Sequence, residues 1–293
     1  MTGKKRSILQ KTNYATSSAL ELKFRIIPAP ENLREDVECF RTYEYTGGKG
    51  LAIKVSPNGV PGIVFQHNNG WSAIENIITH SGLTVTPTLF LYGPGTEPSV
   101  MTYKKGPYTT TQVILKPYAL NTLLGINAST LTNGLVELNE FSTEDLNMQL
   151  IEASNEQEVI TLLTNFLLAK LKQAKTRDAL VEESLRFIHK NIASISVKYL
   201  LEHLNISERH FERRFSQTVG ISPQSYIRVK RFNEAIRLMK TRQYERLTDI
   251  AYALNFHDQS HFIRDIKAFS GITPKSISQK ADDFNVQGGY FYV

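Results

Sequence analysis

The sequence predicts an α+β protein with two unlike parts, a β-rich domain followed by an all-α domain. A chain of 293 residues suits two domains better than one. Short apolar runs separated by turn residues fill the N-terminal part, and one helical sequence pattern occurs twice within residues 195–278. We therefore expect a β-rich domain over 1–175 that ends in an amphipathic helix, a helical domain over 177–280, and a tail over 281–293.

The N-terminal part has the pattern of a β-sandwich or barrel. Residues 1–20 are polar, basic and rich in Ser and Thr, and we expect a loosely held arm there. Turn residues then separate short runs of β-forming residues between Lys23 and Lys116. The predicted strands lie at 37–45, 62–66, 84–92 and 108–115. Together these features favour a cupin-like fold.

Several aromatic side chains of the β-rich part suit either the wall of an effector cavity or the core. They are Trp71, Phe65, Phe90, Tyr92 and Tyr103. His67 and His80 stand 13 residues apart and form no His-x-His pair, so we expect no metal site and no cofactor. The glycine patterns of nucleotide sites and of serine hydrolases are also missing, so we expect no catalytic residues.

After Phe141 the pattern becomes helical. Residues 142–145 can open a helix, and a second helix is predicted over 155–175. Its apolar residues recur at helical spacing: Val159, Leu162, Leu163, Phe166, Leu167 and Leu171. This stripe either covers its own domain or joins two protomers into a homodimer. Residues 172–177 are the predicted linker.

The repeated sequence pattern predicts two helix-turn-helix units in series. Six positions of the two copies correspond at an offset of 51: Phe211, Arg213, Phe215, Gly220, Ser222 and Pro223 match Phe262, Arg264, Ile266, Gly271, Thr273 and Pro274. In each copy an apolar helix pattern precedes a polar turn and a second helix, near 208–218 and 258–269. A connecting helix is predicted over 223–240.

The ends of these helices carry the expected capping residues. Ser207 and Asp258 stand where a side-chain oxygen can cap the helix N-terminus. Gly220 and Gly271 suit a left-handed helix end. Pro223 suits the first turn of the connecting helix.

This repeated sequence pattern resembles the DNA-binding domain of the AraC/XylS family of bacterial transcription regulators. The residues that carry the resemblance are Ser207, Phe211, Arg213, Phe215, Gly220, Ser222, Pro223, Tyr226, Arg231 and Ala235, then Ile250, Ala251, Phe256, Asp258, Ser260, Phe262, Arg264, Lys267, Gly271, Thr273 and Pro274. Four sites depart from the family pattern: Leu201, Asn255, Ile266 and residues 276–277. More loosely, residues 34–141 are similar to the sensor domain of one group of these regulators.

The resemblance implies double-stranded DNA as the partner, with both second helices in the major groove. Their outward residues are Arg209, Glu212, Arg213, Gln217, Gln259, Ser260, His261, Ile263 and Arg264. Arg can pair with guanine, Gln with adenine, and a carboxylate with cytosine. For Arg213 and Arg264 the alternatives are a phosphate contact or an intradomain salt bridge. Candidate phosphate contacts or ordinary surface charges are Lys198, Lys230, Arg231, Arg242 and Lys267.

The distribution of charge agrees with a polyanionic partner. Residues 185–280 hold 17 Lys and Arg against 8 Asp and Glu, whereas the rest of the chain holds 17 against 20. The basic excess is thus confined to the helical part. A single cysteine, no signal-peptide pattern and no membrane-length apolar run predict a cytoplasmic protein that does not contact a membrane.

The sequence therefore predicts a sequence-specific DNA-binding transcription regulator and not an enzyme. Control by a small-molecule effector in the N-terminal domain is the accompanying hypothesis, and RNA polymerase is a further partner if the protein activates. The alternative is a metal-independent ligand-binding protein, or a cupin-type enzyme, with an auxiliary basic domain. The sequence leaves open the effector, the operator, the sign of regulation and the oligomeric state.

Overall fold

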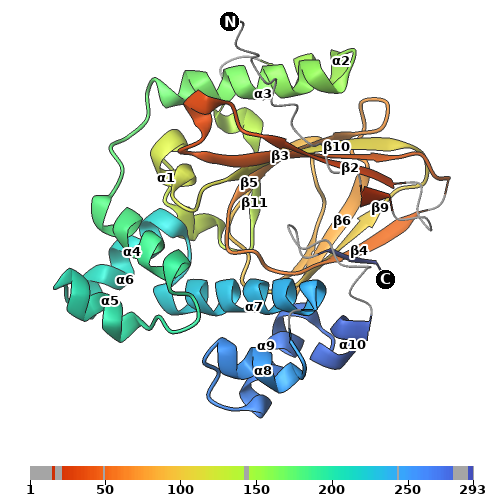
Figure 1. The fold of residues 1–293 in the computed structure, drawn as a ribbon. Coiled ribbons are helices and arrows are strands. Elements are labelled where there is room, and N and C mark those ends of the chain that lie inside the picture. The colour runs from red at the N-terminus through yellow and green to blue at the C-terminus, as the bar shows by residue number, and fades with distance from the viewer. Residues whose placement is uncertain are drawn as a thin grey trace, which may run out of the picture.

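The computed structural model describes residues 15–16, 22–48, 50–141, 145–242, 244–279 and 290–292. Two antiparallel β-sheets form the N-terminal part, and helices form the C-terminal part (Figure 1). The predicted α+β class is confirmed. Most of the predicted arm and tail lies outside the described residues.

The larger sheet has, among the residues that the structure describes, the strand order β1-β2-β3-β10-β5-β8-β11. Their bounds are β1 Ala15–Thr16, β2 Leu22–Pro28, β3 Val37–Tyr45, β10 Tyr108–Leu115, β5 Gly62–His67, β8 Leu89–Tyr92 and β11 Leu135–Glu137. The predicted strands at 37–45 and 108–115 are confirmed, and they pair with Phe40 opposite Val113.

The smaller sheet has the order β12-β4-β9-β6-β7. Its strands are β12 Tyr290–Tyr292, β4 Leu51–Val55, β9 Ser99–Tyr103, β6 Ile74–Thr79 and β7 Gly82–Thr84. The single strand predicted over 84–92 is wrong, because β7 ends at Thr84 and β8 begins at Leu89 in the other sheet. Pro87 lies in the segment between β7 and β8, and it lacks the N–H group that hydrogen bonding between β-strands requires.

The two sheets pack face to face as a sandwich. Val64, Phe90 and Tyr108 from the larger sheet meet Ile53 and Tyr103 from the smaller one. The rings of Tyr103 and Tyr108 stack with centroids 4.7 Å apart. Of the two predicted forms, barrel or sandwich, the structure has the sandwich.

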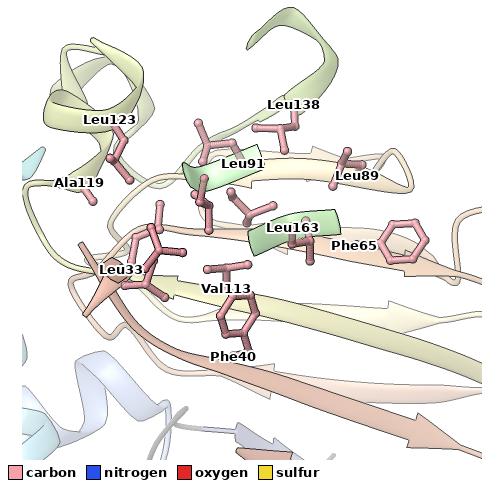
Figure 2. Close-up of a cluster of buried hydrophobic side chains, with 14 of the residues drawn as sticks. Leu33, Phe40, Phe65, Leu89, Leu91, Val113, Ala119, Leu123, Leu138 and Leu163 are labelled. Atoms are coloured by element: carbon pink, nitrogen blue, oxygen red, sulfur yellow. The ribbon is translucent and has the colours of Figure 1, made fainter. Parts of the chain in front are cut away.

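Helix α3 (Glu156–Leu171) covers the outer face of the larger sheet. Leu163 and Leu167 are fully buried in a cluster that includes Phe40 and Val113, and Figure 2 shows Leu163 among these sheet residues. The apolar stripe therefore packs on its own β-rich part. The helix begins after Asn155, whose Oδ1 accepts a hydrogen bond of 3.0 Å from the Glu158 amide, and it ends four residues before the predicted Lys175.

Shorter elements complete the N-terminal part. Asp145 caps α2 (Leu146–Glu152) by accepting a hydrogen bond of 3.1 Å from the Met148 amide. The remaining elements are the 3-10 turns η1 Glu31–Leu33, η2 Ala128–Leu131 and η3 Leu138–Phe141, and helix α1 Ala119–Leu124.

The helices that follow in the described residues are α4 Ala179–Lys190, α5 Val197–Leu204, α6 Glu208–Val219, α7 Pro223–Thr241, α8 Leu247–Ala253, α9 Gln259–Ser270 and α10 Pro274–Gln279. They form two small cores, one around Phe211, Phe215 and Tyr226 and the other around Phe232 and Phe262. Because α7 contributes Tyr226 to the first core and Phe232 to the second, it joins them. In the described part of the chain, no helix has the length and apolar character that crossing a membrane requires.

Candidate nucleic-acid interface

Helices α5 and α6 form the first helix-turn-helix unit. Ser196 opens α5 by accepting a hydrogen bond of 3.2 Å from the Tyr199 amide. Asn205 ends α5 in the left-handed region, with φ of 47°. Ser207 precedes α6 in an extended conformation but makes no side-chain cap bond, so the predicted cap at this position is absent.

Helices α8 and α9 form the second unit with a turn that is one residue longer. Buried Leu200 matches Ile250 at an offset of 50, whereas Phe211 matches Phe262 at an offset of 51. The additional residue is His257, whose side chain is 87% exposed. The inserted side chain therefore faces solvent and takes no part in the core of the unit.

The cap predicted for the second unit is confirmed. Asp258 Oδ1 accepts a hydrogen bond of 2.7 Å from the His261 amide at the start of α9. This hydrogen bond is the main cause that lowers the pKa of the Asp258 carboxyl. Asn255 adopts the left-handed conformation with φ of 53°, so Asn serves at this position where the family pattern has glycine.

The connecting helix α7 fixes how the two units are placed. It has 19 residues, which corresponds to about 28 Å. The first unit packs on its N-terminal half and the second on its C-terminal half (Figure 1). Gly220 and Gly271 end α6 and α9 in the left-handed region, as predicted. The predicted span of 223–240 agrees with the observed helix to within one residue.

Most of the predicted DNA-contacting residues lie exposed on the helices. They are Arg209, Glu212, Arg213 and Gln217 on α6, Gln259, Ser260, Arg264 and Lys267 on α9, and Lys198 on α5. His261 is only half exposed, with Nε2 3.6 Å from Asp265 Oδ2. Among the described residues, no carboxylate forms an ion pair with Arg213 or Arg264. An intradomain salt bridge is therefore not the role of these two arginines in this arrangement.

Two of the basic residues proposed for phosphate contact are engaged elsewhere. Arg231 donates to the carbonyl oxygens of Ile192 and Ile195, at 3.1 and 2.6 Å, and so ties the α4–α5 connection to α7. Lys230 points toward the β-rich part, where Nζ donates to the carbonyl oxygen of Asn58 at 2.9 Å. Neither position faces solvent in the way that the sequence interpretation required, because side chains on one helix divide among its faces.

Two ion pairs that the sequence did not indicate stiffen the helical part. Arg214 on α6 forms a bidentate pair with Asp178, the cap of α4, at 2.6 and 2.8 Å. Arg228 on α7 lies 2.8 Å from the buried carboxylate of Asp265 on α9. Each pair spans more than thirty residues of sequence, and no local pattern links its members.

The β-rich part also contacts the ends of both second helices. The hydroxyl of Thr132, just after η2, donates to the carbonyl oxygen of Gly220 at the end of α6. A Cβ atom built on Gly220 would lie 2.5 Å from Cγ of Pro94, so this approach requires glycine. At the end of α9, a Cβ built on Gly271 would lie 1.9 Å from Nζ of Lys54 on β4.

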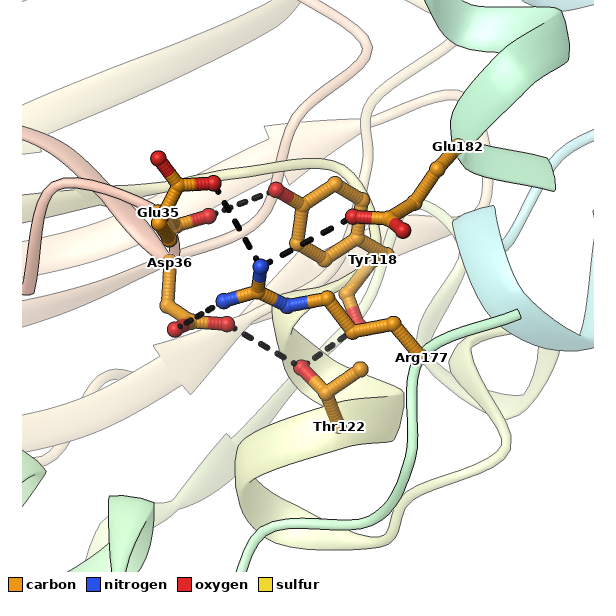
Figure 3. Close-up of polar contacts among 6 residues, drawn as sticks. All are labelled: Glu35, Asp36, Tyr118, Thr122, Arg177 and Glu182. Atoms are coloured by element: carbon orange, nitrogen blue, oxygen red, sulfur yellow. Dashed lines mark hydrogen bonds and ion pairs between the residues drawn. The ribbon is translucent and has the colours of Figure 1, made fainter. Parts of the chain in front are cut away.

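The predicted linker is held by a polar cluster (Figure 3). Arg177 donates to the buried carboxylate of Asp36 at 2.7 Å and lies 3.4 and 3.7 Å from Glu35 and Glu182. Its guanidinium also lies over the Tyr118 ring, 5.3 Å from the centroid. Burial is the main cause that raises the pKa of Tyr118 to about 12. The two parts of the chain therefore meet in a specific polar contact around Arg177.

Comparison with protein families finds two matches. Residues 200–280 match a family described as "Helix-turn-helix domain". Residues 25–137 match one described as "Domain of unknown function (DUF6597)". The first match coincides with the two helix-turn-helix units, and the second with most of the sandwich.

Among solved structures, the chain is similar to ToxT from Vibrio cholerae. The identity is 14% and the TM-score 0.46, over 82% of this chain and 97% of that one. The DNA-binding domain of AdpA, solved with a target DNA, gives 20% identity and a TM-score of 0.33 over 35% of this chain and 92% of that one.

Curated relatives share the C-terminal part. The transcriptional activator AarP of Providencia stuartii is 29% identical over 104 residues, which is 35% of this chain and 76% of AarP. The activator RhaS of Escherichia coli (strain E24377A) is 33% identical over 88 residues, 28% of this chain and 30% of RhaS. With the repeated units of residues 195–278 and the helix-turn-helix family match, this similarity shows that the C-terminal part of the chain is a helix-turn-helix domain of the AraC type.

Proposed function

We propose that the protein regulates transcription by sequence-specific binding of double-stranded DNA, with α6 and α9 in two successive major grooves. The observation that carries the proposal is the pair of matching arginines, Arg213 and Arg264. They are exposed at equivalent places on the two helices. By contrast, Arg214 on α6 and Arg228 on α7 form ion pairs with Asp178 and Asp265. Exposed arginines on a helix that fits the major groove are suited to guanine.

The length of α7 supports simultaneous contact with two grooves. Successive major grooves on one face of DNA are roughly 34 Å apart. A connecting helix of about 28 Å with a unit at each end approaches that separation. The excess of 17 basic over 8 acidic residues in 185–280 supplies the phosphate attraction that such a complex needs.

The test is selection of duplexes from a random library with the full chain, followed by hydroxyl-radical footprinting of the best duplex. We expect two protected tracts per protomer, separated by about one helical turn of 10 base pairs. The double variant Arg213→Ala with Arg264→Ala should no longer enrich a particular duplex sequence, whereas Lys170→Ala on α3 should still enrich it. Enrichment of no sequence, or protection of one groove only, would overturn the proposal.

For the rest of the chain we propose a sensor role. The domains are taken as 1–175 and 177–280, the site of action as the cytoplasm, and the effector as a small molecule held by the sandwich. AarP and RhaS are named activators, which favours activation and hence RNA polymerase as a partner. A homodimer would need a surface other than the stripe of α3, because that stripe is buried in its own domain.

A further inference from the structure

A cavity of about 130 Å³ lies between the two sheets of the sandwich. Val64, Ile77, Phe90 and Met101 form apolar walls, and Ser56, Gln112 and Glu97 add polar groups. An engineered apolar cavity of about 150 Å³ binds benzene. The cavity therefore has room for one compact molecule.

The polar groups of this cavity limit the charge of a ligand. Among the described residues that line it, Glu97 carries the sole charge. Ser56 is 2% exposed, and no described residue offers its Oγ a hydrogen-bond partner. An unpaired buried hydroxyl is costly, and a ligand could satisfy it. A carboxylate near an apolar space repels anions, so the cavity suits an uncharged or cationic ligand with one hydrogen-bonding group.

The segments that line the cavity also hold the DNA-binding part. Asn58 lines the cavity, and its carbonyl oxygen accepts the hydrogen bond from Lys230 of α7. The next residue, Gly59, packs against α7: a Cβ built on it would lie 3.3 Å from Cγ1 of Val229. Val55 also lines the cavity and follows Lys54, which lies beside Gly271 at the end of α9. Strand β4 and the loop after it thus connect the cavity with α7 and α9.

A second route runs through the loops at 93–97 and 131–134. Asn133 lines the cavity and accepts a hydrogen bond of 2.7 Å from the Thr96 amide. The two loops touch so closely that a Cβ built on Gly93 would lie 1.9 Å from the carbonyl oxygen of Leu131. They therefore have to move together. Thr132, beside Asn133, donates to Gly220 at the end of α6.

We propose that the cavity binds a compact, uncharged or cationic ligand, and that residues 54–59 and 131–134 transmit its presence to α6, α7 and α9. This rests on the sensor role proposed above. Binding would displace the segments that line the cavity, and these contact the ends of both recognition helices and the helix that spaces them. Ligand binding would then change how well the two helices fit successive grooves.

The binding step can be tested with three probes of similar size: benzyl alcohol, benzylamine and benzoate. Methionine methyl NMR of the full chain provides the readout, because Met101 lines the cavity and Met148 lies exposed on α2 as an internal control. We expect millimolar benzyl alcohol and benzylamine to shift the Met101 signal, and benzoate to leave it in place. Glu97→Gln should remove the response to benzylamine more than that to benzyl alcohol. No shift with any probe, or an equal shift with benzoate, would overturn the ligand assignment.

The transmission step needs a duplex selected as described above. Benzyl alcohol should change the affinity of the full chain for that duplex by about fivefold or more. Thr132→Val and Lys230→Met should each reduce this change, whereas Thr130→Val on η2 and Lys170→Met on α3 should preserve it.

The outcomes separate the two proposals. If the unmodified chain binds no selected duplex, the DNA-binding proposal fails. If DNA and probe both bind but the affinity does not change, or if the variants respond like their controls, the transmission route is wrong while the regulator remains.

Discussion

Nζ of Lys230 lies 2.9 Å from the carbonyl oxygen of Asn58, so α7 is hydrogen-bonded to the loop that follows β4. Lys230 also lies over the ring of Tyr226, 5.1 Å from its centroid. A lysine that the sequence suggests for DNA phosphate thus belongs to the contact between the two parts. The spacing helix and the β-rich part are therefore mechanically connected.

This contact should leave a mark on the pH dependence of stability. Burial is the main cause that lowers the pKa of Lys230 to about 8, with Glu38 raising it and Lys116 lowering it. Between that value and about 10.4, the usual value for lysine, the unfolded chain binds more protons than the folded one, so stability rises with pH there. Thermal melting from pH 7 to 10 should show this gain in the wild type and not in Lys230→Met. Parallel pH profiles for the two proteins would count against a lowered pKa of Lys230.

Substitutions of base-contacting residues and of phosphate-contacting residues should affect DNA affinity in different ways. Arg213→Ala and Gln259→Ala should each cost about 1 to 3 kcal/mol on the preferred duplex and relax selectivity. Lys198→Ala should weaken all duplexes alike and reduce the salt slope by about 1. Fluorescence anisotropy on selected and random duplexes provides the measurement. Equal losses on both duplexes would move Arg213 to the phosphate-contact class.

The apolar stripe of α3 should be essential for folding of the β-rich part. Because Leu167 is fully buried and Phe166 packs against the same cluster, changing both to Glu should cost more than about 4 kcal/mol. Circular dichroism should show loss of the sandwich at room temperature or a much lower melting temperature. Asn165→Glu with Ala169→Glu adds the same charge on exposed positions of α3 and should melt near the wild type. A folded Phe166→Glu, Leu167→Glu protein would contradict this role.

Arg177 and Asp36 should be energetically coupled. The Asp36 side chain is 2% exposed, so Arg177→Met would leave a buried carboxylate without its cation. A double-mutant cycle with Asp36→Asn should give a coupling of about 0.5 to 3 kcal/mol in urea unfolding. Arg34→Met, an exposed neighbour, serves as the control and should show no coupling to Asp36→Asn. Additive effects of the two main substitutions would mean that the ion pair contributes little.

The sequence by itself determined the helical part in detail. Its capping residues, glycines and apolar spacing are local features, and local geometry decides helix ends, so α7 and both recognition helices lie within one residue of their predicted bounds. The same local pattern placed Arg213, Arg264 and Gln259 on exposed surfaces, because the buried positions Phe211 and Phe262 fix the opposite face. Strands β3 and β10 were equally predictable, since β-branched and aromatic residues make up most of each run.

Only the tertiary structure decided which charges remain available and where the two parts meet. Arg and Lys are residue types that commonly contact phosphate. The partners of Arg231 and Lys230, however, are carbonyl oxygens that lie 36 or more residues away in the sequence. The stripe of α3 suited its own domain or a second protomer, and in the structure it packs on the larger sheet. Pairings such as Arg177 with Asp36 and Thr132 with Gly220 depend on distances across the folded chain. No periodicity in the sequence carries that information, because these contacts form only when distant segments pack together.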